Sequence, residues 1–202
     1  KLSFLELFHG PTLAFKDMAL TVLPHLMVES KKLSGFPKKT LILTATSGDT
    51  GGAALSGFKD VENVFIVVLY PTNGVSPFQA AQMNYYTGKN AIAVSVEGNF
   101  DDCQNLVKKV FTSGIKLNNY ELSSANSINI SRLLPQSFYY MYSSLVVRNR
   151  IAIDSKLDNP SIISIVPSGN FGNLTSGLIA KEMGAPIAGF VAATNTNRTI
   201  PD

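Results

Sequence analysis

The strongest constraint on the fold is a regular alternation of apolar strand-like runs with helical patterns. Residues 64–70 form a nearly continuous apolar run, and similar short runs occur at residues 41–44, 91–96, 162–166 and 189–194. Strands that are apolar on both faces are typical of parallel sheets covered by helices on each side. The pattern therefore predicts an α/β fold built on a parallel sheet.

Helical spacing fills most of the intervals between these runs. From Asp17 onward, apolar residues recur at helical spacing as far as Met27. Ser76 and Pro77 are typical of a helix start, with serine as the cap and proline in the first turn. Further helices are expected through residues 53–55, 106–110, 127–147 and 174–183.

The composition excludes several classes of function. The chain has 202 residues, 45% of them hydrophobic and 15% charged, so it can bury a substantial core. The net charge of +3 is modest and the basic residues are scattered, which argues against a nucleic-acid surface. Two histidines and one cysteine, far apart in sequence, give no metal-site spacing. The single cysteine, Cys103, excludes an internal disulfide, and we interpret it as a small buried residue.

Two glycine-rich turns follow predicted strands and are candidate anion sites. The first contains Ser47 and Gly48, and the second spans residues 169–173. Backbone N–H groups at the start of a helix lack partners and can bind an anion. One such turn alone is more often a tight connection, but two suggest a ligand with two anionic ends. Neither turn matches the nucleotide-binding fingerprints.

Lys16 and Arg132 are the candidate cationic residues. Lys16 lies where the predicted helix begins, at the positive end of its dipole, where the neutral amine is favoured and can attack a carbonyl. The ordinary alternative is a solvent-facing lysine. Arg132 lies five residues beyond Ser127, near the start of the helix predicted over residues 127–147. Arginine suits bidentate phosphate contacts. A capped helix with a surface arginine explains these residues equally well.

Four separated segments agree with the motifs of one enzyme family. They are residues 6–17, which contain Lys16, and residues 44–52, 126–132 and 169–173, in that order. Together they resemble threonine synthases, which are pyridoxal-phosphate enzymes of the tryptophan-synthase β fold. The resemblance covers essentially the whole chain.

The resemblance implies a parallel-sheet three-layer α/β fold of the tryptophan-synthase β type. Residues 1–40 and 156–202 would be parts of a larger domain, and residues 41–155 would form a smaller βα domain. We interpret the chain as the middle of a longer protein. We expect it to have little activity by itself, since no segment matches the Ser or Thr that normally contacts the cofactor's pyridine nitrogen.

The resemblance also implies a role for each site residue. Lys16 would hold pyridoxal 5′-phosphate as a Schiff base and then act as general acid and base. Asp49 would contact the O3′ side of the cofactor, although many relatives carry Asn at this position and an acid would repel a substrate carboxylate. The cup for the cofactor phosphate would consist of Gly169, Asn170, Phe171, Gly172 and Asn173. The substrate-binding residues would be Thr46, Ser47, Gly48, Thr50, Asn126, Ser127 and Arg132.

These roles predict the conversion of O-phosphohomoserine and water to L-threonine and phosphate, by γ-elimination and β-addition of water. Two alternatives remain open: a phospho-lyase or dehydratase on the same fold, and a non-catalytic module that binds an anionic metabolite. We expect a cytoplasmic monomer or dimer that binds a small-molecule substrate and no metal, nucleic acid or membrane.

Overall fold

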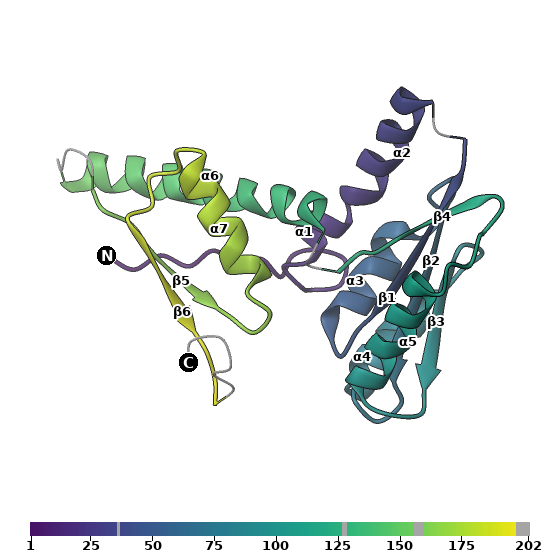
Figure 1. The fold of residues 1–202 in the computed structure, drawn as a ribbon. Coiled ribbons are helices and arrows are strands. Elements are labelled where there is room, and N and C mark those ends of the chain that lie inside the picture. Colours follow the sequence, from purple (N-terminus) through teal and green to yellow (C-terminus); the bar gives the residue numbers. More distant parts are fainter. Residues whose placement is uncertain (36, 127–128, 156–159, 197–202) are drawn as a thin grey trace. The chain divides into compact units, whose positions relative to one another are not determined.

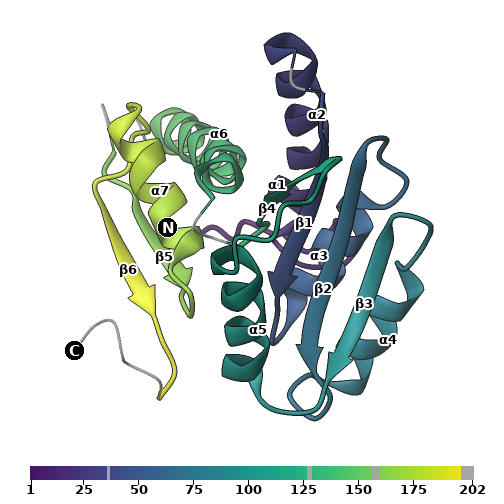
Figure 2. The same ribbon diagram turned by 45° about the vertical axis from the view of Figure 1, so that its right-hand side comes forward.

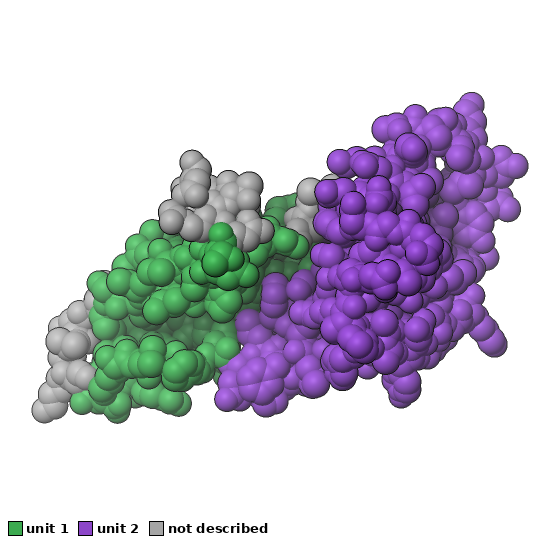
Figure 3. Space-filling view, turned by 90° about the horizontal axis from the view of Figure 1, so that it is seen from below, with its two compact units in different colours: residues 1–5, 130–202 green, residues 6–129 purple. Residues whose placement is uncertain are grey.

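The computed structural model describes residues 1–35, 37–126, 129–155 and 160–196. The chain divides into two compact units, shown as a ribbon in Figure 1 and coloured in Figure 3. Unit 1 comprises residues 1–5 and 130–202, and unit 2 comprises residues 6–129. The domain boundaries at residues 41 and 156, predicted for the protein as a whole, stay a prediction. None of the helices in the described ranges is long and apolar enough to cross a membrane.

Unit 2 is built on a four-stranded parallel sheet with the strand order β3-β2-β1-β4. The strands are β1 (Lys39–Ala45), β2 (Val64–Pro71), β3 (Ala91–Val96) and β4 (Tyr120–Ser123). The parallel arrangement of the first three is confirmed, and β1 pairs Ile42 with Ile66 of β2. Sequence analysis missed β4, because its four residues contain too short an apolar run to indicate a strand.

Helices cover both faces of this sheet, as Figure 2 shows. Successive residues of a strand point to opposite faces. Ile66 accordingly packs in the cluster that contains α3 (Asp49–Phe58), whereas Val67 packs in the cluster that contains α5 (Phe100–Thr112). Cys103 of α5 is completely buried, which confirms its interpretation as a small core residue.

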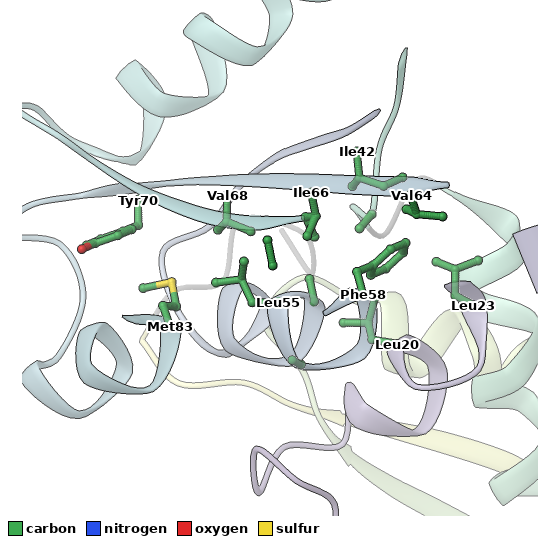
Figure 4. Packing of buried hydrophobic residues seen from close by; sticks show 14 residues of the cluster. Leu20, Leu23, Ile42, Leu55, Phe58, Val64, Ile66, Val68, Tyr70 and Met83 are labelled. Atoms are coloured by element: carbon green, nitrogen blue, oxygen red, sulfur yellow. The ribbon is translucent and has the colours of Figure 1, made fainter. Parts of the chain in front are cut away.

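The main core of unit 2 lies between the sheet and the helices on the α3 side (Figure 4). It joins α1 (Asp17–Leu20), α2 (Leu23–Ser34) and α4 (Pro77–Tyr85) to the sheet. Its large, fully buried side chains include Phe58, Leu20, Leu23, Ile42, Leu55, Ile66 and Met83. Burial of a large apolar side chain stabilises a fold by about 1.5–3 kcal/mol. This core therefore holds α1, α3 and α4 against the sheet.

The prediction of a single helix from Asp17 to Met27 is wrong. Helix α1 ends at Leu20, and α2 begins at Leu23. Proline lacks a backbone N–H, and its ring clashes with the carbonyl four residues earlier, so it is tolerated in the first turn of a helix but not in the interior. Pro24 lies in the first turn of α2, and a new helix starts there for this reason.

Helices α4 and α5 begin with capping boxes. The Ser76 hydroxyl accepts a hydrogen bond from the Gln79 N–H at 3.2 Å, and Gln79 Oε1 accepts one from the Ser76 N–H at 3.0 Å. The prediction of Ser76 as the cap and Pro77 in the first turn is thus confirmed. Asn99 and Asp102 cap α5 in the same way.

Unit 1 contains α6 (Ile130–Ser155), β5 (Ile163–Pro167), α7 (Gly172–Glu182) and β6 (Gly189–Ala193). The two strands are parallel, α7 connects them, and α7 packs against α6. A Cβ atom on Gly177 would lie 2.6 Å from the Phe190 ring, so this contact requires glycine. The helix predicted over residues 127–147 begins by Ile130 and continues to Ser155, while residues 127 and 128 lie outside the described residues.

Gly57 allows α3 to touch the backbone of α1, because a Cβ atom there would lie 2.0 Å from the Leu20 carbonyl oxygen. Alanine ordinarily favours a helix over glycine by about 1 kcal/mol. At this position we expect Gly57→Ala to lower the free energy of unfolding of the full-length protein by about 1–3 kcal/mol, since the added methyl overpacks the contact. Urea unfolding followed by circular dichroism measures the change.

Gly88→Ala is the matched control in the same unit. Its Cβ atom would meet only the flexible end of Lys59, at 3.3 Å. An equal loss of stability in both variants would contradict the steric explanation.

Candidate active site

Lys16 lies at the end of a loop that a buried carboxylate holds in shape. Thr12 donates two hydrogen bonds to Asp17, from its backbone N–H to Oδ2 at 2.8 Å and from its hydroxyl to Oδ1 at 2.6 Å. Asp17 is only 3% exposed. A Cβ atom on Gly10 would lie 2.4 Å from Asp17 Oδ2, so the loop can approach this carboxylate only with glycine at that position.

Helix α4 supports the same loop from outside. Gln82 Nε2 donates a hydrogen bond to the Thr12 carbonyl at 3.2 Å, and the Tyr86 hydroxyl donates one to the Pro11 carbonyl at 2.8 Å. Loops are ordinarily the more mobile parts of a protein. These hydrogen bonds tie the segment before Lys16 to the packed part of unit 2, so the base of the lysine side chain is held in place.

The Lys16 amine faces the carboxylate of Asp49, the first residue of α3. Lys16 Nζ lies 3.7 Å from Asp49 Oδ2 and 4.7 Å from the centroid of the Phe15 ring. The Lys16 side chain is 16% exposed, and that of Asp49 is 52% exposed. Because α1 has only four residues, few peptide dipoles align behind Lys16, and the helix dipole has less effect on its amine than the sequence predicts. The Asp49 carboxylate is therefore a more important neighbour of the Lys16 amine than the helix dipole.

Thr46 shapes the turn between β1 and α3. Its hydroxyl oxygen accepts hydrogen bonds from the Gly48 N–H at 3.1 Å and the Gly51 N–H at 3.2 Å, and the side chain is almost completely buried. The hydroxyl lies in the position to donate to the Gly48 carbonyl as well, at 3.0 Å. Ser47 is exposed and Thr50 is half-buried. Of these side chains, Ser47 is thus the one most open to a ligand.

Gln79 is a site neighbour that sequence reasoning missed. Its Nε2 donates a hydrogen bond to Asp49 Oδ1 at 2.9 Å, so the two oxygens of Asp49 face Gln79 and Lys16 respectively. The sequence indicated the helix start at Ser76 and Pro77, which places Gln79 in the first turn. A contact between residues thirty positions apart depends on how α3 and α4 pack, and no local pattern reports that.

The predicted substrate residue Asn126 is oriented by a buried threonine of β1. The Thr44 hydroxyl donates a hydrogen bond to Asn126 Oδ1, and Thr44 is completely buried. The Asn126 N–H donates to the Ser124 hydroxyl at 3.2 Å. The side-chain amide of Asn126 is therefore held in one orientation. Its predicted neighbour Ser127 lies outside the described residues.

In unit 1, the predicted phosphate turn lies between β5 and α7. Phe171 has a φ of 56° and precedes the first residue of α7, Gly172. The Ser168 N–H donates to the Ala193 carbonyl at 2.9 Å, which ties the start of the turn to β6. Gly169 has open space where a Cβ atom would lie. The turn thus leads directly into the N-terminus of an 11-residue helix, which suits an anion.

Asn173, in the first turn of α7, is held by two tyrosines of α6. The hydroxyls of Tyr139 and Tyr140 both donate to Asn173 Oδ1, at 2.5 and 2.8 Å. Burial raises the pKa of both tyrosines above the ordinary value, so both hydroxyls stay neutral donors. Sequence analysis gave neither tyrosine a role in the site.

Arg132, the third residue of α6, is only 2% exposed. Burial lowers the pKa of its guanidinium from 12.5 to about 10, although the nearby Tyr139 acts in the opposite direction. The side chain therefore stays charged at neutral pH. This burial argues against the interpretation of Arg132 as an ordinary surface arginine.

The structure thus assembles the predicted residues in two groups. Unit 2 brings Lys16 and Asp49 next to the turn at residues 46–48 and also contains Asn126, whereas unit 1 contains residues 169–173 and Arg132. Within the described ranges, no cluster of three or more His, Cys, Asp or Glu residues could hold a metal ion.

Comparison with known proteins finds threonine synthases, both among curated sequences and among solved structures. No protein-family model matches the chain. The chain is 44% identical to threonine synthase of Buchnera aphidicola subsp. Schizaphis graminum over 201 residues, which cover 99% of this chain and 44% of the relative. It is 46% identical to threonine synthase of Serratia marcescens over 199 residues, 98% of this chain and 44% of the relative. The crystal structure of pyridoxal-phosphate-bound threonine synthase from Brucella melitensis matches with a TM-score of 0.77 and 43% identity, over 95% of this chain and 39% of that one.

The chain therefore spans less than half the length of the curated relatives it matches. The structural likeness confirms the expected fold class, an α/β fold with parallel sheets of the type found in threonine synthases.

Tyr140 makes the stability of the protein depend on pH. Because burial raises its pKa in the folded state, the unfolded chain loses this proton first as the pH rises above 10, the ordinary value for tyrosine. The folded state then binds more protons than the unfolded state, so stability falls with rising pH. We expect Tyr140→Phe in the full-length protein to flatten this fall by up to about 1.4 kcal/mol per pH unit.

Urea unfolding at a series of pH values from about 9 to about 11 measures how steeply the free energy of unfolding falls with pH in the unchanged protein and in Tyr140→Phe. Tyr142→Phe is the control, because Tyr142 lies on the same helix but is 70% exposed, and it should keep the steeper slope. The lowered pKa of Arg132 acts in the opposite direction above about pH 10, equally in all variants. Equal slopes in Tyr140→Phe and the unchanged protein would contradict the assignment.

Proposed function

We propose that this chain, which is homologous to threonine synthases over nearly its whole length, is part of an enzyme that converts O-phosphohomoserine and water to L-threonine and phosphate. The single observation that carries the proposal is the placement of Lys16. Its amine is largely shielded, lies 3.7 Å from the Asp49 carboxylate and sits on a loop held by Asp17. A surface lysine of no function needs no such support.

Residues in each unit, taken by itself, suit one group of pyridoxal 5′-phosphate, the cofactor of the proposed function. Lys16 offers a primary amine for its aldehyde, and the turn at residues 169–173 offers the N-terminus of α7 for its phosphate. When bound, this cofactor supplies an electron sink that stabilises negative charge next to the α carbon of an amino acid. The hydrogen bonds from Tyr139 and Tyr140 would keep Asn173 in one orientation within that turn.

In this function, Lys16 both holds the cofactor and moves protons. Its Nζ, once released, would accept the α proton of the substrate and return a proton later in the reaction. The Asp49 carboxylate, oriented towards Nζ, would stabilise the charged form of the amine between these steps.

We assign the substrate carboxylate to the turn between β1 and α3. Ser47 would contact it with an exposed hydroxyl, while Gly48 and Thr50 lie at the start of α3. Because the Thr46 hydroxyl is engaged within the turn, we propose that Thr46 acts by shaping the turn.

We assign the substrate phosphate to Asn126, Ser127 and Arg132. A guanidinium in buried, low-dielectric surroundings attracts an anion more strongly than an exposed one. The orientation of the Asn126 amide by Thr44 supports a binding role as well. We further propose a cytoplasmic enzyme with a small-molecule substrate.

Replacement of Lys16 tests the function directly. In the full-length protein we expect Lys16→Ala to lower kcat for threonine formation by about 10²–10⁴-fold, the range for a positioned acid–base group. Borohydride treatment with pyridoxal phosphate should attach the cofactor to the Lys16-containing peptide of the unchanged protein, as mass spectrometry of the digest will show.

Lys38→Ala is the control, because Lys38 is exposed in the same unit. This variant should keep both its activity and the borohydride trapping of the cofactor at Lys16. Trapping at a lysine other than Lys16 would contradict the proposal. A keto acid and ammonia as products would instead indicate a dehydratase, and a protein that binds a metabolite without turnover would indicate a binding module.

Arg132→Lys keeps the positive charge but removes the bidentate fork. We expect the KM for O-phosphohomoserine to rise about 10- to 100-fold, because hydrogen bonds to charged groups contribute about 1.5–3 kcal/mol. Steady-state kinetics and the affinity for pyridoxal phosphate are measured together, and the affinity should be unchanged. Arg150→Lys, at an exposed position of the same helix, is the control for the helix itself. An unchanged KM in Arg132→Lys would refute the assignment.

A further inference from the structure

We propose that Gln79 is a positioning residue that acts on the Lys16 amine through Asp49. The inference rests on the proposed function, because only a reacting lysine gives this contact a consequence. It is carried by three contacts that link the starts of α4, α3 and α1.

The first contact fixes the Gln79 side chain at one end. Gln79 Oε1 accepts the Ser76 N–H at 3.0 Å, and the Ser76 hydroxyl accepts the Gln79 N–H at 3.2 Å. A side chain held in a capping box has lost most of its rotamer freedom already. The rest of the amide group therefore points in a defined direction.

The second contact uses the other end of the same amide. Gln79 Nε2 donates to Asp49 Oδ1 at 2.9 Å, a distance typical of a good hydrogen bond. The amide also lies against the turn before α3, because a Cβ atom on Gly48 would be 3.4 Å from Gln79 Nε2. One oxygen of the Asp49 carboxylate is thus occupied by a neutral donor.

The third contact follows from the shape of a carboxylate. When Gln79 holds Oδ1, rotation of the Asp49 carboxylate is restricted, and Oδ2 stays directed at Lys16 Nζ, 3.7 Å away. A half-exposed aspartate without this donor would rotate among several rotamers. The effect of Gln79 on the amine is therefore indirect and electrostatic.

The ordinary alternative is that Gln79 only caps α4. Ser76→Ala separates the two roles, because it removes the other half of the same capping box and leaves the Gln79 amide in place. It should lower the stability of the protein through the lost cap. Gln79→Ala removes the cap and the contact with Asp49 together.

The test measures the reactivity of Lys16 in the full-length protein without cofactor. Formaldehyde and cyanoborohydride methylate neutral amines, and mass spectrometry of the Lys16 peptide gives the rate. We expect labelling in Gln79→Ala to be about 2- to 5-fold faster, because a half-exposed ion pair contributes up to about 1 kcal/mol to keeping the amine charged. Ser76→Ala should label at the rate of the unchanged protein.

A double-mutant cycle completes the test. If Gln79 acts through Asp49, Gln79→Ala should add no further change in a protein that already carries Asp49→Ala. Equal acceleration by Ser76→Ala, no acceleration by Gln79→Ala, or additive effects in the double variant would each overturn the inference. Because the labelling uses neither cofactor nor substrate, its failure is distinguishable from failure of the proposed function.

Discussion

The close packing of α3 is the constraint on which the rest of unit 2 depends. Gly57 lets the helix touch the backbone of α1, Gly51 leaves room for Met83, and Gly52 leaves room for Gln82. Side chains at these positions would push α1 and α4 away from α3. The ion pair of Lys16 with Asp49 and the hydrogen bond of Gln79 to Asp49 exist only because the starts of α1, α3 and α4 lie close together. A helix of low intrinsic propensity is thus stabilised by packing, and the site is a product of that packing.

The polar residues around the candidate site in unit 2 divide into those that shape the backbone and those that face outward. Asp17 and Thr46 are buried and each accepts hydrogen bonds from backbone N–H groups nearby, so they determine the form of a loop and a turn. Thr44 does the same for a side chain, that of Asn126. Ser47 and Asp49 remain exposed to solvent. A single sequence motif therefore contains both residues that shape the backbone and residues that are open to a ligand, and only the hydrogen bonds distinguish them.

The elements that depend on local chemistry could be predicted from the sequence. The apolar run of β3 and the cap at Ser76 both lie where expected. Strand β4 depends instead on the edge that β1 offers, which no property of residues 120–123 reveals. The break before Leu23 is indicated by Pro24, although the apolar spacing continues through it. In the site, the resemblance of residues 6–17 to a family segment predicted Lys16, whereas its neighbours follow from tertiary packing.

Asp49 shows how one residue of a turn changes the chemistry around a neighbouring amine. The sequence alone suggests that an acid at this position repels a substrate carboxylate. In the structure its oxygens face the Gln79 amide and the Lys16 amine, so its charge is balanced within unit 2. An asparagine would accept from Gln79 equally well but would bring no charge to Lys16. Because Asp49 is half-exposed, the ion pair contributes no more than about 1 kcal/mol. A pair of this strength favours the charged form of the amine and still lets it exchange a proton, which the proposed acid–base role of Lys16 requires.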